Sequence, residues 1–159
     1  MKELFIQFPT LIIFLHVMSA VIWVGGMIAM RYAVHYSMQK QLESTIRLER
    51  SLENLKKFFY LVLPFIALLL GTAFILIFGL ELKDTPLYKF VLVKEGLWTI
   101  MTIIYFTVFI KRYKAEKAFL RSDFMATKLQ LQTIANVYIP LNIVLGLIAI
   151  YLGVTLRGF

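Results

Sequence analysis

Cysteine is absent from this chain of 159 residues. Its absence excludes disulfides, iron–sulfur clusters, thiolate metal sites and c-type haem attachment, so any haem has to be held non-covalently. Acidic residues are also few, because 9 Asp and Glu stand against 17 Lys and Arg, for a net charge of +8. The basic residues border apolar segments, as the topology signals of membrane proteins do, which argues against nucleic acid as a partner.

Apolar sequence is abundant: 60% of the residues are hydrophobic and the mean hydropathy is +0.80. Four runs, at residues 11–32, 58–80, 88–110 and 135–156, each approach or exceed the ~20 residues that cross a bilayer's hydrocarbon core. The first run is too long for the ~7–15-residue core of a signal peptide, so we expect it to stay as a permanent helix. We therefore expect an all-α integral membrane protein surrounded by lipid. It would be a single domain over residues 1–159, a four-helix transmembrane bundle with helices at about 10–33, 58–81, 88–111 and 135–156.

Basic charge is concentrated in the first and third connections between these helices. The first connection holds Arg31, Lys40, Arg47, Arg50, Lys56 and Lys57, and the third holds Lys111, Arg112, Lys114, Lys117, Arg121 and Lys128. The opposite side has Lys2, Lys83, Lys89 and Arg157. The positive-inside rule predicts that both long connections are cytoplasmic and both termini outside, in what would be the bacterial inner membrane.

The three connections differ in length. Residues 81–87 form a short outer loop containing Pro86, so the second and third helices should be antiparallel neighbours. The two cytoplasmic connections are longer, and residues 40–57 show an apolar stripe among charges. We favour helices that continue past the membrane over an interfacial helix that docks a partner.

Two ionisable residues, His16 and Lys94, fall inside predicted spans. Charge at the centre of a bilayer costs about 2.5–3.5 kcal/mol on insertion scales, so such residues are functional candidates by default. At 1.5 Å per residue, His16 lies roughly 8 Å into its run and Lys94 roughly 9 Å into its own, at similar depth in the outer third of the membrane. The alternatives are a His16 that only bonds a backbone carbonyl, and a Lys94 that snorkels to the headgroups or pairs with an acid such as Glu95.

The surroundings of both residues are typical of a packed interior. Ser19, Ala20, Trp23, Gly26 and Met30 follow His16 on roughly one face, while Trp98, Thr102 and Tyr105 continue the face of Lys94. An aromatic, largely apolar pocket with few nitrogen ligands suits a b-type haem, and neutral imidazole is a standard haem ligand. His35 lies 19 residues after His16, about 28 Å along a continuous helix, so we expect it solvated at the cytoplasmic interface.

These motifs together resemble the HemJ-type protoporphyrinogen IX oxidases and the related CopD copper-resistance proteins. HVMSAVIWVGG, with His16, Trp23 and Gly26, is similar to their first-helix motif. The segment LERSLENLKKFFYLVLPFIALLLG, Lys94 in KFVLVKEGLW, NVYIP near the fourth helix and the closing RGF are similar to the HemJ type. The resemblance implies haem b, with His16 and Lys94 at the positions of the family's essential His and Lys. It also implies a six-electron oxidation of protoporphyrinogen IX, with electrons passing to quinone or a respiratory-chain partner.

Three functions thus remain open. The first is a haem-dependent membrane oxidoreductase in which His16 is the metal ligand, His16 and Lys94 are catalytic, and Trp23, Gly26 and Trp98 help to bind the cofactor. The second is a CopD-like copper protein, because Met18, Met27 and Met30 share the first helix with His16 and thioethers suit copper. The third is a structural subunit of a respiratory complex. Gly25, Gly26, Gly146 and Gly153 permit self-association without requiring it.

Overall fold

In a computed structural model of the protein, which describes residues 2–39, 43–81 and 85–156, the chain forms helices joined by short turns. The elements are α1 (Lys2–Gln7), α2 (Pro9–Ile28), the π-helical segment η1 (Ala29–Val34), α3 (His35–Gln39), α4 (Ser44–Gly79), α5 (Tyr88–Leu120), α6 (Phe124–Thr133), the π-helical segment η3 (Ile134–Tyr138) and α7 (Ile139–Thr155).

Consecutive elements join into four spans that are long and apolar enough to cross a membrane: Pro9–Met38, Ser44–Gly79, Tyr88–Leu120 and Phe124–Thr155. The predicted all-α, four-helix architecture is thereby confirmed. Only 22–28% of the residues in their most apolar windows are buried inside the bundle, so most of this apolar surface faces outward. Apolar side chains facing outward along a whole bundle are what a lipid environment requires.

The helices are longer than their apolar runs. Helix α4 begins at Ser44 instead of about residue 58, α5 continues to Leu120 instead of about 111, and the fourth span begins at Phe124 instead of about 135. The basic connections are thus largely helical extensions of the spans, as we favoured over a docking helix. Their apolar stripe explains the length, since Leu52 and Leu55 are buried in the core. Lys40, Lys83, Arg157 and the closing RGF motif lie outside the described residues.

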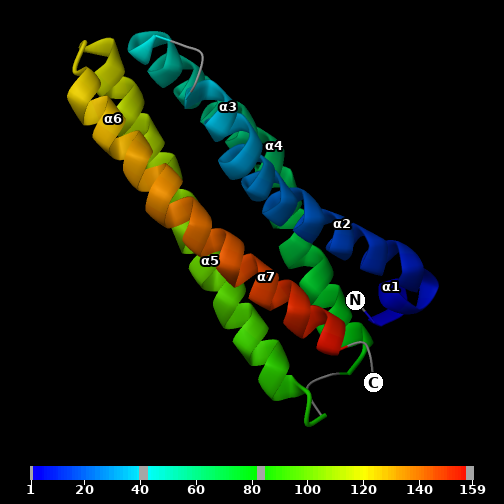
Figure 1. Ribbon diagram of the computed structural model, residues 1–159. Helices are drawn as coiled ribbons and strands as arrows, with labels where there is room; N and C mark the ends of the chain where they lie inside the picture. The colour runs from blue at the N-terminus through cyan, green and yellow to red at the C-terminus, as the bar shows by residue number, and fades with distance from the viewer. Residues whose placement is uncertain (1, 40–42, 82–84, 157–159) are drawn as a thin grey trace.

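The bundle arrangement places α2 and α5 across from each other. Each of them packs on both α4 and α7, so the two face one another across the bundle axis. Figure 1 shows α1 and the end of α7 at one end of an elongated bundle, with α6 and the start of α4 at the other. We call the first the terminal end and the second the basic end, after the basic residues near its turns.

An aromatic cluster fills the middle of the bundle. The Trp23 and Tyr105 rings meet edge to face at 6.4 Å, and the Phe59 and Tyr105 rings do so at 4.9 Å. The Tyr105 hydroxyl donates to the Phe59 carbonyl at 2.9 Å, which gives this buried polar group a partner. Such ring pairs contribute about 0.5–1.5 kcal/mol beyond their buried area.

Close helix approach depends on Gly146 of α7. A Cβ atom placed there would lie 2.6 Å from Val24 Cγ2 and 3.1 Å from Met101 Cε, so the site admits no larger side chain without a shift. Gly25 has open space around it instead. At the terminal end, Glu81 pairs with Lys2 and ties α1 to the end of α4. The hydrogen bond and charge of Lys2 lower the pKa of the Glu81 carboxyl.

Gly146→Val is expected to destabilise the bundle by about 1–3 kcal/mol, because overpacking forces side chains and backbone to shift. Gly25→Val carries the same helix-propensity change on an open site and serves as the matched control. Unfolding of both variants in detergent measures the difference. Equal stability of the two would contradict the close packing of α7 on α2.

Candidate functional site

His16 lies half-buried on α2 and is held by Thr72 of α4. Its Nδ1 atom is 2.9 Å from the Thr72 hydroxyl oxygen. That oxygen also lies 2.8 Å from the Leu68 carbonyl and 3.1 Å from the Leu69 carbonyl. Both carbonyls can only accept, so the one hydroxyl hydrogen points to them, and the oxygen accepts its remaining hydrogen bond from His16.

This arrangement favours a proton on Nδ1 of the neutral imidazole. In a neutral ring the other nitrogen, Nε2, then carries an open lone pair. Metal-binding histidines commonly have this geometry, with one ring nitrogen donating to a protein oxygen and the other ligating the metal. Thr72 is only 3% exposed, so the orienting hydrogen bond is shielded from water. His16 is therefore an oriented imidazole, held by one side-chain hydrogen bond inside the bundle.

Lys94 lies half-buried on α5, across the bundle axis, and its positive charge acts on the His16 ring. A Cβ at Gly153 of α7 would meet Lys94 Nζ at 2.8 Å, so this glycine makes room for the ammonium group. Gly153 is two residues from the end of α7, so the ammonium reaches toward the terminal end. Among the described residues no carboxylate forms an ion pair with Lys94.

The other predicted cofactor residues have different surroundings. Trp23 is 1% exposed and Trp98 is half-buried, and the indole Nε1 of each is buried with no hydrogen-bond partner among the described residues. Gly26 is a close-packing position, because a Cβ there would lie 2.7 Å from Phe58 Cε2. Glu95 is exposed on the outer surface of α5, away from the interior that holds Lys94.

The first span runs continuously from Pro9 to Met38, which separates His16 from the methionines considered as copper ligands. At 1.5 Å per residue Met27 and Met30 lie about 16 and 21 Å further along, and Met18 points roughly 200° round the helix. No group of three His, Asp or Glu side chains that could hold a metal ion occurs in the described part of the chain. His35, expected to be solvated, is instead half-buried beside a cavity at the basic end.

Two residues of this site, Thr72 and Gly153, escaped the sequence argument. Thr72 is a lone hydroxyl in an apolar run, and threonines there usually bond only their own helix. The distance of each residue from its helix end is the signal that could have paired Thr72 with His16. Thr72 is seven residues before the end of α4, and His16 is seven residues after the start of α2. Antiparallel neighbours bring such positions to one level.

Thr72→Val keeps the side-chain shape and removes the acceptor of the His16 proton. An unpaired buried donor costs about 1–3 kcal/mol, so the free energy of unfolding should fall by that amount. Thr72→Ser retains the hydroxyl and should keep most of the stability. Unfolding titrations in detergent measure the free energy of unfolding of both variants. A Thr72→Val variant at least as stable as Thr72→Ser would rule out the hydrogen bond between His16 and Thr72.

No family model, curated protein or solved structure matches this chain. The likeness to HemJ-type and CopD proteins therefore stays a prediction from short motifs. The arrangement of His16, Thr72 and Lys94 is the feature from which a function can be inferred.

Proposed function

We propose that this membrane protein is an oxidoreductase that binds a b-type haem through His16. One observation carries the proposal: Nδ1 of His16 lies 2.9 Å from the Thr72 hydroxyl, so Nε2 is the ring nitrogen that we assign to the haem iron. A single His with an oriented second nitrogen suffices for haem, whereas a metal ion bound by protein alone needs more ligands than His16 has nearby. When bound, the haem supplies one-electron redox chemistry.

The surrounding residues fit the periphery of a porphyrin. Among the described residues the Lys94 ammonium has no carboxylate partner, and a haem propionate would provide one. We assign Lys94 this anchoring role, because its ammonium reaches toward the terminal end. The indoles of Trp23 and Trp98 would contribute apolar walls, and their unpaired N–H groups could donate to polar atoms at the edge of the ring.

The substrate proposal rests on the family resemblance. It is the oxidation of protoporphyrinogen IX to protoporphyrin IX, with electrons leaving to quinone or a respiratory-chain partner. Membrane-embedded helices suit both an apolar porphyrinogen and a lipid-soluble acceptor. For the orientation we propose a cytoplasmic basic end and an outer terminal end, because the basic residues gather at the first of these ends.

The haem proposal predicts a b-type difference spectrum, reduced minus oxidised, for the protein purified after expression with ample haem. His16→Ala should lose the Soret band, whereas His35→Ala, which changes the only other histidine, should keep it. Lys94→Met should retain haem more weakly, because it loses the propionate partner. A wild type without a Soret band, or a band that survives His16→Ala, would contradict the proposal. Co-purification of haem-free protein with larger oxidase subunits would favour a structural role.

Orientation is testable because the chain has no cysteine of its own. Lys89→Cys and Ser122→Cys place single thiols at exposed positions near opposite ends of α5. A membrane-impermeant maleimide added to intact cells should label Lys89→Cys and spare Ser122→Cys. The reverse pattern would show that the terminal end faces the cytoplasm.

A further inference from the structure

A cavity opens at the basic end, separate from His16. It has a volume of about 50 Å³ and is bounded by η1 and α3 on one side, α4 on another, and η3 with α7 on the third. A water needs about 10–15 Å³ on this measure, so the cavity accommodates roughly four groups of that size. Both π-helical segments contribute to its wall, and π-helical turns in helices are frequent at functional sites.

Arg31 of η1 lines this cavity and has no charge partner among the described residues. Its Nε atom is buried and unpaired, and its Nη2 makes only a long hydrogen bond, 3.4 Å, to Asn136 Oδ1. The Tyr32 ring lies 5.8 Å from the guanidinium carbon. Partial burial of an uncompensated guanidinium has a desolvation cost, which a bound anion would offset.

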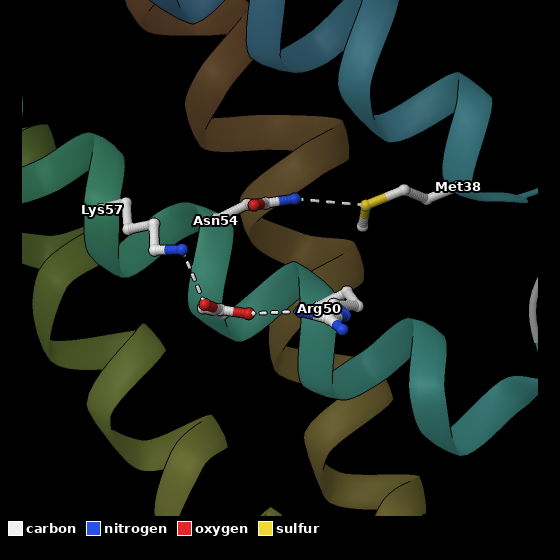
Figure 2. A network of polar contacts seen from close by, with 5 residues as sticks. Met38, Arg50, Asn54 and Lys57 are labelled. Atoms are coloured by element: carbon white, nitrogen blue, oxygen red, sulfur yellow. Dashed lines mark hydrogen bonds and ion pairs between the residues drawn. The ribbon is translucent and has the colours of Figure 1, made fainter.

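The rest of the lining also favours an anion, since no acidic side chain of the described residues contributes to it. Arg31 and Arg47 both act electrostatically on His35, another lining residue. Asn54 donates from Nδ2 to the Met38 sulfur at 3.2 Å, as Figure 2 shows, and a thioether is a weak acceptor that a better one would replace.

Glu53, the acidic residue next to Asn54 on α4, is already neutralised. Glu53 accepts from Arg50 Nη1 at 3.0 Å and from Lys57 Nζ at 2.7 Å, the other contacts drawn in Figure 2. The charge of Glu53 is therefore balanced by basic residues of its own helix and does not compensate the positive charge of Arg31.

We propose that this cavity binds a phosphate group through Arg31, and that the phosphate belongs to the headgroup of an anionic phospholipid. The size of the cavity suits the five atoms of a phosphate, and the guanidinium fork matches its oxygens. Arg31 stands where the first apolar run ends, at the level of the headgroups, and basic pockets between membrane helices bind anionic headgroups. The thioethers of Met30 and Met38 and the His35 ring could suit copper(I), but the Arg31 guanidinium in the same lining opposes a cation there.

The test measures lipid retention by native mass spectrometry of the full chain in neutral detergent. Phosphatidylglycerol and phosphatidylcholine of matched acyl chains compete. The wild type should prefer phosphatidylglycerol about tenfold, because the choline cation cancels the headgroup charge and is repelled by the Arg31 guanidinium. Arg31→Gln should abolish the preference. Arg50→Gln removes the same charge from the same end and should retain it, because Arg50 is paired with Glu53 and does not line the cavity.

Two outcomes of the lipid competition would overturn the proposal. The first is an equal preference for phosphatidylglycerol in the wild type and Arg31→Gln. The second is a wild type that does not distinguish the two lipids, which can be seen even if the variant fails to fold. Inorganic phosphate that raises the melting temperature of delipidated wild type but not of Arg31→Gln would support the phosphate site and assign it to free phosphate. Copper(I) bound by wild type and lost in Met38→Leu would overturn it in favour of a metal.

Discussion

A polar group buried between packed helices has to find its partner within the protein, and this constraint organises the bundle. The Tyr105 hydroxyl meets the Phe59 carbonyl, and the buried Arg112 guanidinium meets Glu116 at 2.7 Å and the Leu52 carbonyl at 3.4 Å. At His16 the same constraint fixes a ring nitrogen, because the Thr72 hydroxyl has its own hydrogen committed to its helix. Satisfying one imidazole nitrogen is what leaves the other available for chemistry.

Some buried polar groups lack a partner among the described residues, and these groups indicate where a ligand could bind. Lys94 and Arg31 are partly buried cations without a carboxylate among the described residues, and they stand toward opposite ends of the bundle. The indole N–H groups of Trp23 and Trp98 are buried donors with no acceptor in the part of the chain that the structure describes. Unpaired groups of this kind are few in stable proteins, and each is a reason to expect a ligand. These groups are the basis on which we propose a haem beside His16 and Lys94 and an anion beside Arg31.

The sequence predicts the coarse fold because membrane crossing is a matter of length and hydropathy. Four apolar runs, and the depths of His16 and Lys94 within them, are visible from residue counts. The helix ends are not, since α4 extends to Ser44 through an amphipathic stretch whose packing depends on neighbours far away in the chain. Thr72 and Gly153 act through such neighbours as well, so no local pattern reveals them. His35 is half-buried because it lies beside a cavity between three spans. The segments that line this cavity are far apart in the sequence, so no local pattern predicts it.

The central claim is that His16 presents a free Nε2 because Thr72 holds the proton on Nδ1. Nitrogen-15 NMR of histidine-labelled protein in detergent reports the protonation of each ring nitrogen, and a His35→Gln sample assigns the two histidines. The account predicts a neutral His16 ring protonated on Nδ1, with an Nε2 signal that shifts when haem is added. A ring protonated on Nε2, or an Nε2 signal indifferent to haem, would contradict it.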